Sequence, residues 1–300
     1  MSDDVTWTCP SAGVDHRALE QLSDLAEDLA ASSSSTELTG PSTVNFWMGL
    51  DVNVSRRFLR LATCGAVLAG GSIISSQDRI ITLSVDDPRP LAAALQDLEA
   101  RYGWVVTYED PIYQHADELQ DVTASVRRQD DATRPRVIVP RGGPFTFTWP
   151  PSSAPPAILE NLLQAYNASG HPGVFRLANT GATFHVIPVR SRGADGVDKE
   201  LPAVLDAPIF VPHGGRTAHE LLLAIVERVS RATGVSVGLG SYPVNWSLQT
   251  QVEGAVGYEP ARTALVRLLD SPRLKFSWRM FYAPDMKRYF LNIHIVSQVR

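Results

Sequence analysis

The histidines are the residues best suited to hold a metal ion, but their spacing matches no metal-binding motif. The chain has seven, and six of them fall in residues 77–300, hereafter the body: His115, His171, His185, His213, His219 and His294. None forms H-E-x-x-H or H-x-H. His213 and His219 flank the stretch HGGRTAH and could meet in space, yet a pair without a nearby third ligand is more typical of a polar surface than of zinc. We expect no metal site, and we expect His185 and His294 on the exposed faces of their strands.

Nucleophilic and phosphate-binding chemistry also lacks a motif. There is no G-x-S-x-G sequence, and the two cysteines, Cys9 and Cys64, both precede the body. The pairs Gly142-Gly143 and Gly214-Gly215 lack the spacing and the lysine of a phosphate loop, so each predicts a turn.

Paired carboxylates are the remaining catalytic candidates. They occur at Asp86-Asp87, Glu109-Asp110 and Asp130-Asp131. Neighbouring residues of a strand point to opposite faces, so these acids do not converge on one substrate. Asp87 precedes a proline and is better explained as a helix cap. The sequence therefore predicts no catalytic residue and no cofactor-binding residue.

Aromatic residues in loops are the strongest sign of a contact surface. Tyr242 and Trp246 lie in GSYPVNW, and Trp149 leads into PPSSAPP. Aromatic side chains beside proline in a loop are hard to bury completely, so we expect these three to contact a protein partner. Trp104 and Trp278 lie in apolar strands and are expected in the core.

The elements that position these residues form a pattern that occurs twice. RIITLSV (79–85) alternates as a strand, leucines at helical spacing follow over 91–102 with Gly103 as the stop, and WVVTY (104–108) is a second strand. The same order returns as a strand at 208–211, a T-x-x-E capping box at 217–220, a helix ending at Gly234, and a strand at 235–239.

A second pattern, a strand, a helix and two strands, also occurs twice. Its elements are expected at 145–149, after Pro155, at 173–177 and at 183–189, and again at 248–252, after Pro260, at 275–281 and at 289–296.

Together the patterns predict an α+β fold of two tandem small modules. Each is a βαβ unit followed by a βαββ unit, with helices packed on short mixed sheets. The first module spans 77–190 and contains a charged surface insertion at 111–141, a linker spans 191–202, and the second module spans 203–300.

The run LSVDDPRPLAAALQDLEARYGWVVTYED, followed later by the PPAILENLL helix and paired strands, resembles the short N-terminal domain (STN) of secretins and TonB-dependent receptors. The resemblance implies small βαβ modules in the periplasm that engage partner proteins. No outer-membrane barrel or secretin ring follows in these 300 residues, so it implies the fold and the binding habit but not the receptor or secretin functions.

Export is predicted by SRRFLRLATCGAVLAGGSII, residues 55–74. Three arginines precede an uncharged run, Leu61 to Ile74, and small residues follow it, which is the order of a signal peptide. As a helix the run would be about 21 Å long, short of a hydrocarbon core of about 30 Å. We assign 48–76 to a signal peptide that begins at Met48, and 1–47 to a disordered or over-predicted extension. A lipoprotein site at Cys64 is disfavoured because the apolar run follows that cysteine.

Charge and cysteine content agree with an exported binding protein. The body is formally neutral and has no cysteine, so it lacks the basic surface that nucleic-acid binding requires. We therefore expect a periplasmic or secreted, non-catalytic protein-interaction module with a protein partner in the bacterial envelope. It would meet the membrane only transiently, through the signal segment. The alternatives are a hydrolase-like enzyme acting on envelope material and, if the apolar run is not cleaved, a membrane-tethered structural protein.

Overall fold

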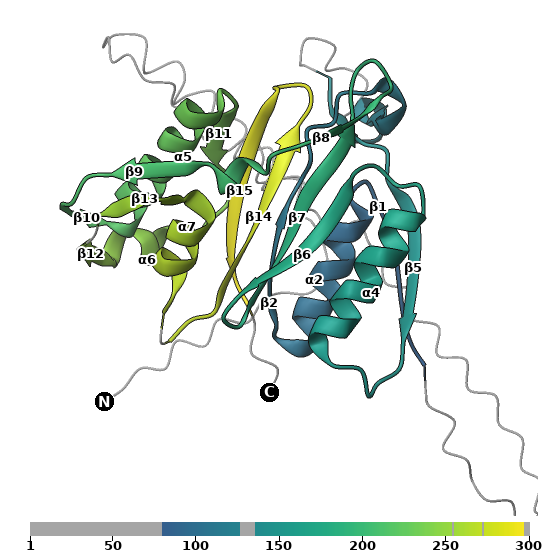
Figure 1. The fold of residues 1–300 in the computed structure, drawn as a ribbon, viewed down its shortest axis with the longest axis horizontal. Coiled ribbons are helices and arrows are strands. Elements are labelled where there is room, and N and C mark those ends of the chain that lie inside the picture. The colour runs from purple at the N-terminus through teal and green to yellow at the C-terminus, as the bar shows by residue number, and fades with distance from the viewer. Residues whose placement is uncertain (1–79, 127–135, 254, 272, 297–300) are drawn as a thin grey trace, which may run out of the picture. The chain divides into compact units, whose positions relative to one another are not determined.

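The structure is a computed structural model, and it describes residues 80–126, 136–253, 255–271 and 273–296. All of these lie in one unit of the chain, Asn45–Arg300. The proposed extension at 1–47 and the signal peptide at 48–76 lie outside the described residues. The fold is α+β, as predicted (Figure 1). No helix among the described residues is both long and apolar enough to cross a membrane.

The first half of the described chain contains both predicted patterns, separated by the charged insertion. Its elements are β1 (Ile81–Asp87), α2 (Pro90–Tyr102), β2 (Val105–Glu109), a 3-10 turn (Ala116–Glu118), β3 (Leu119–Asp121), α3 (Thr123–Val126), β4 (Ile138–Pro140), β5 (Gly143–Trp149), α4 (Pro155–Ala168), β6 (Val174–Thr180) and β7 (Thr183–Arg192). Within the insertion, β3 and β4 pair as an antiparallel hairpin.

The second half repeats this order with different additions. Its elements are β8 (Asp198–Glu200), a 3-10 turn (Val204–Asp206), β9 (Pro208–Val211), β10 (Gly215–Thr217), α5 (Ala218–Thr233), β11 (Ser236–Leu239), α6 (Val244–Gln249), β12 (Gln251–Glu253), β13 (Val256–Pro260), α7 (Ala261–Leu269), β14 (Phe276–Ala283) and β15 (Arg288–Ile295). β8 pairs with the end of β7, so the segment proposed as a linker contains a hairpin.

The local signals that begin and end the helices act as the sequence predicts. Thr217 and Glu220 form a reciprocal capping box at the start of α5. Gly103 and Gly234 follow α2 and α5 with φ of 64° and 72°, a left-handed conformation that glycine adopts without steric cost.

One predicted element is wrong. Residues 248–252, expected as a strand, contain the end of helix α6 and the start of the short strand β12. Pro243 lies just before this helix and accepts the backbone N–H of Ser247 at 3.0 Å, which closes the first helical turn. The strand that precedes α7 is instead β13.

The two halves share the same strand pairings and meet in one sheet. In each half, two strands form an antiparallel ribbon, β1–β5 and β9–β13. The other three form the orders β2-β7-β6 and β11-β15-β14. β14 then pairs in parallel with β2, which joins these strands into a sheet of order β11-β15-β14-β2-β7-β6, with β8 added on β7. Because the halves share a sheet, their division into two separate modules stays a prediction.

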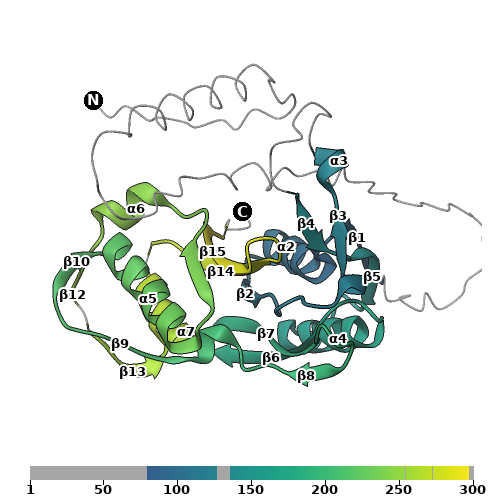
Figure 2. The same ribbon diagram turned by 90° about the horizontal axis from the view of Figure 1, so that it is seen from above.

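Each half has its own hydrophobic cluster, and the clusters lie on opposite faces of the shared sheet. Tyr108 belongs to the first cluster and Met280 to the second. In the β14–β2 register Tyr108 is opposite Arg279, and Met280 is opposite Glu109. Paired residues point to the same face and successive residues alternate, so Tyr108 and Met280 face opposite ways. Accordingly, α2 and α4 lie on one side of the β14–β2 junction and α5 and α7 on the other (Figure 2).

Candidate functional site

The most concentrated polar chemistry lies where β2 meets β14. Glu109 and Asp110, at the end of β2, are both completely buried. As their adjacent positions predict, they turn to different partners and do not form a converging pair. A buried carboxylate must be paired or hydrogen bonded, so the partners decide what these acids can do.

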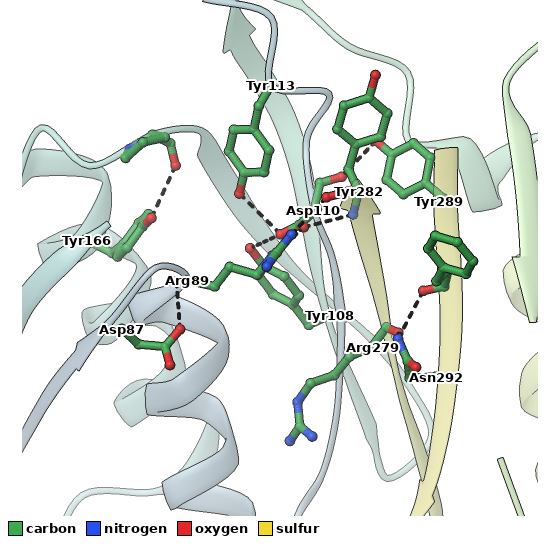
Figure 3. Close-up of polar contacts among 12 residues, drawn as sticks. Asp87, Arg89, Tyr108, Asp110, Tyr113, Tyr166, Arg279, Tyr282, Tyr289 and Asn292 are labelled. Carbon is green, nitrogen blue, oxygen red and sulfur yellow. Dashed lines mark hydrogen bonds and ion pairs between the residues drawn. The ribbon is translucent and has the colours of Figure 1, made fainter. Parts of the chain in front are cut away.

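Four donors surround the carboxylate of Asp110, and we call this set the Asp110 network. Oδ1 accepts the hydroxyls of Tyr108 and Tyr113 at 2.8 and 3.1 Å. Oδ2 accepts Arg89 Nε at 2.7 Å and the backbone N–H of Tyr282 at 2.9 Å. Figure 3 shows these groups converging on Asp110. Burial, and then the charge of Asp110, raise the pKa of the Tyr108 and Tyr113 hydroxyls well above the ordinary value.

The backbone around Asp110 strengthens the junction between the halves. Its N–H donates to the carbonyl of Met280 at 2.8 Å, and its carbonyl accepts the Tyr289 hydroxyl at 3.0 Å. Arg89 also donates from Nη2 to the carbonyl of Tyr282 at 2.8 Å. Both oxygens of Asp110 are therefore occupied, and the network joins β14 and β15 to the first half.

A second buried ion pair lies on the opposite face of the sheet. Glu109 accepts Arg262 Nη2 of α7 at 2.7 Å and the backbone N–H of Val204. Arg262 also donates from Nε to Asp206 at 2.8 Å. Burial raises the pKa of Glu109 although the charge of Arg262 opposes this. This pair joins the two halves directly, since Glu109 belongs to the first half and Arg262 to the second.

A third such pair involves the last turn of α2. Glu99 Oε2 lies 2.7 Å from both Arg279 Nη2 and His294 Nε2. Burial by itself would raise the pKa of Glu99, but the hydrogen bond from His294 and the charge of Arg279 outweigh it and lower the pKa. All three buried acids of the first half therefore hold groups of the second half.

The histidines at equivalent strand positions do not lie where the sequence predicted. His185 was expected to be exposed, but it is 1% exposed, and its Nδ1 lies 2.7 Å from Thr107 Oγ1. Its ring lies 5.6 Å from that of Trp278, and burial lowers its pKa to about 4. The prediction is wrong because groups of the second half, namely Trp278 and the Arg262–Asp206 ion pair, lie close to this face of β7. His294 is only partly exposed, because it pairs with Glu99.

These arrangements provide structural pairing and leave no vacant ligand set among the described residues. No group of three His, Cys, Asp or Glu side chains in the described ranges is placed to hold a metal ion. The three acids were not identified from the sequence as structural, because each binds a group of the second half that lies more than 150 residues away along the chain.

The three aromatic residues predicted as contacts fall into two groups. Trp149 is 2% exposed and stacks on Phe147 in the first cluster, so its predicted surface position is wrong: it ends β5 with its side chain on the inner face. Tyr242 and Trp246 are partly buried against the second cluster. Tyr242 stacks on His219, and the ring of Trp246 lies 4.5 Å from that of Phe276. A contact role for these two stays a prediction.

Two other aromatic residues are far more exposed. On the β9–β13 ribbon, Phe210 is 53% and Tyr258 is 82% exposed. Phe210 points outward because its neighbours Ile209 and Val211 are buried. Tyr258 lies in the irregular stretch of β13, between the residues that pair with Val211 and with Ile209. We call these two residues the aromatic face. The alternation in PIFV could have revealed Phe210.

The equivalent ribbon of the first half is polar on the same side. There, Ser84 and Thr146 are opposite each other and their hydroxyls lie 3.1 Å apart. The architecture therefore does not require aromatic side chains at this place. Helix α6 has exposed apolar groups of its own, since Val244 and Leu248 are 42% and 50% exposed.

An open groove lies between α4 and the edge strand β6. It has a volume of about 500 Å³ and is lined by Glu160, Leu163, Gln164, Asn167, Ala168, Phe175, Arg176 and Leu177. Its walls are a helix and a strand edge, and the two side chains at its floor, Leu163 and Phe175, are apolar and buried.

Comparison with known proteins gives no relative from which a role could be transferred. No protein family model, no curated protein and no solved structure matches the chain.

Proposed function

We propose that this chain is an exported, non-catalytic protein-interaction module that works in the periplasm on a protein partner of the cell envelope. The observation that supports it best is the aromatic face, Phe210 and Tyr258. Large aromatic side chains are enriched at protein interfaces, where they bury much area at low cost in conformational entropy. The polar outer side of the equivalent β1–β5 ribbon indicates that these side chains are not a by-product of the fold.

The saturation of the Asp110 carboxylate supports a binding role over catalysis. A general acid or base must reach its substrate, but both oxygens of Asp110 already accept two hydrogen bonds each inside the protein. The alternative, a hydrolase-like enzyme of the envelope, would need convergent polar groups in a deep pocket.

The proposed binding role is tested by photo-crosslinking in the envelope of the cells that make the protein. A crosslinker placed at Phe210 in the full chain should capture one dominant partner. The Tyr258→Ser substitution should reduce this product about tenfold, because it removes half of the aromatic face. The matched control is Ser84→Ala with Thr146→Ala on the polar ribbon, with the crosslinker kept at Phe210. This control should leave the product unchanged.

Two results would count against the proposal. Equal crosslinking in the Tyr258→Ser variant would exclude the aromatic face as the contact surface, and absence of any crosslinked protein would oppose a binding role. The proposed export is tested separately, by mass spectrometry that locates the N-terminus of the purified protein. A mature N-terminus after residue 70 fits a cleaved signal, whereas one before residue 48 contradicts it.

A further inference from the structure

The outer edge of β6 is longer than the edge at the other end of the seven-stranded sheet. β6 has seven residues, whereas β11, at the other end of the sheet, has four. β6 pairs only with β7, so its outer side meets no strand in the described part of the chain. An open edge presents backbone N–H and C=O groups to any extended chain that reaches it.

A side-chain amide already occupies one pairing position on this edge. Asn167 of α4 donates from Nδ2 to the carbonyl of Phe175 at 2.8 Å, and its Oδ1 accepts the N–H of Phe175 at 3.0 Å. This two-bond contact is the one that a peptide group in a neighbouring strand would make. The side-chain amide of Asn167 thus satisfies the outward backbone N–H and C=O of Phe175. The other outward backbone groups of β6 have no such side-chain partner in the described part of the chain.

The next two pairing positions are Leu177 and Asn179. Backbone groups alternate in direction along a strand, so these residues direct their N–H and C=O to the same side as Phe175. Opposite Phe175 on β7 is Pro188, which has no N–H to donate, consistent with the outward direction at this position. No described residue donates to or accepts from the outer backbone groups of Leu177 or Asn179.

In the second half of the chain, the strand equivalent to β6 is β14, and its outer edge is paired with another strand. β14 forms a hairpin with β15 as β6 does with β7, and Phe276 of β14 is buried as Phe175 is. The outer edge of β14 is not open, because β2 pairs with it, and Asp110 N–H donates to the carbonyl of Met280. The strand in the same topological position thus already holds an added strand within this molecule.

We propose that the groove between β6 and α4 binds an extended peptide segment of a partner protein, which adds to β6 as a further strand. The inference rests on the proposed protein-binding function and names the partner's chemistry, but it does not depend on the aromatic face. Backbone pairing would give affinity, and alternate side chains would give specificity. The segment lacks proline at the residues that pair with Leu177 and Asn179, and it places an apolar side chain over Leu163 and Phe175.

The probe is a phage-displayed library of random ten-residue peptides, selected on the full-length chain. A synthetic fluorescein-labelled peptide of the selected sequence is then titrated by anisotropy. We expect Asn179→Pro to weaken binding at least tenfold, because it removes an outward N–H and no ladder bond to β7. The matched control, Asn179→Ala, keeps that N–H and should bind within twofold of the original chain.

Peptides methylated on the backbone provide a test that leaves the protein unchanged, which matters if Asn179→Pro lowers the melting temperature. Methylation of the amides that pair with β6 should abolish binding, whereas methylation of the alternate amides should have little effect. Equal binding by both methylated peptides, or no enriched sequence at all, would overturn the proposal. Concentration-dependent self-association that Asn179→Pro abolishes would also overturn it, since the occupant would then be a second copy.

The two proposals fail in different ways. If the peptide selection fails while the crosslinked partner at Phe210 remains, the groove is excluded and the binding function stands. If both fail, the protein-binding function itself is excluded.

Discussion

The carboxylate of Asp110, at the end of β2, accepts the backbone N–H of Tyr282 on β14 at 2.9 Å, across 172 positions of sequence. The contact lies where β14 pairs in parallel with β2 and joins the three-stranded groups of the two described halves into one sheet. A buried charge is held there by Arg89 and two tyrosine hydroxyls, so its removal should affect the whole body and not one loop.

Asp110→Asn should lower the free energy of unfolding by about 3–5 kcal/mol, since it removes a fully buried carboxylate and leaves the partly buried Arg89 without its counter-charge. Urea unfolding followed by circular dichroism measures this. Asp97→Asn is the matched control, because Asp97 pairs with Arg101 on the surface of α2, and it should cost less than about 1 kcal/mol. Equal losses in the two variants would contradict a structural role for the Asp110 network.

His185 should make stability depend on pH between about 4 and 6.5. Its pKa is lowered to about 4 in the folded protein from an ordinary 6.5, so the unfolded chain binds more protons in this window. The contribution is therefore complete above pH 6.5 and is lost as the pH falls toward 4. The loss should reach about 3 kcal/mol, from about 1.4 kcal/mol for each unit of difference.

The pH dependence can be assigned by substitution. Unfolding at pH 7.5 and pH 4.5 should differ by much less in His185→Gln than in the original chain. His294→Gln is the comparison, because it removes one of the two partners of Glu99 and leaves His185 in place. An unchanged pH profile in His185→Gln would show that another group titrates.

Trp149 and Phe210 should respond in opposite ways to truncation. Trp149→Ala should cost about 3–5 kcal/mol, because it removes a buried side chain from the first cluster. Phe210→Ala should change stability by less than about 0.5 kcal/mol, because Phe210 is largely exposed. Thermal unfolding of both variants distinguishes them, and comparable losses would mean that Phe210 is packed.

The two glycine pairs, Gly142-Gly143 and Gly214-Gly215, should also differ in their tolerance of substitution by alanine. A Cβ added to Gly142 would lie 2.3 Å from the carbonyl oxygen of Asp87 and 2.6 Å from that of Pro88, whereas one added to Gly215 meets nothing within 4 Å. Gly142→Ala should therefore cost at least about 1–3 kcal/mol, the usual range for overpacking, and Gly215→Ala close to none. Denaturant midpoints of the two variants test the difference.

Local sequence signals predicted most helices and strands. Long-range strand pairing determined how the two halves join and which side chains are buried between them. Gly103, Gly234 and the Thr217–Glu220 capping box end or begin helices where expected, because their effect depends only on neighbouring residues. The sequence could not indicate that β14 would pair with β2. It therefore could not indicate that His185 would be covered, or that Glu109 would meet Arg262.

The sequence also failed to predict which aromatic residues are exposed for contact with a partner. Trp149 was predicted from its proline-rich neighbourhood, but its side chain is set by the inward face of β5. The alternation of Ile209, Phe210 and Val211 was a better local signal than proximity to proline.

The acids at the end of β2 also bear on how the chain folds. The first half is complete in sequence long before β14 is available, so until then β2 is an unprotected edge that could pair with another unfinished chain. Charged residues pointing from an edge strand are a recognised defence against such aggregation. Glu109 and Asp110 would provide that defence while they are still solvated. The two carboxylates become buried only when Glu109 binds Arg262 and Asp110 binds the backbone N–H of Tyr282. The same carboxylates would therefore oppose aggregation of the unfinished chain and stabilise the finished fold.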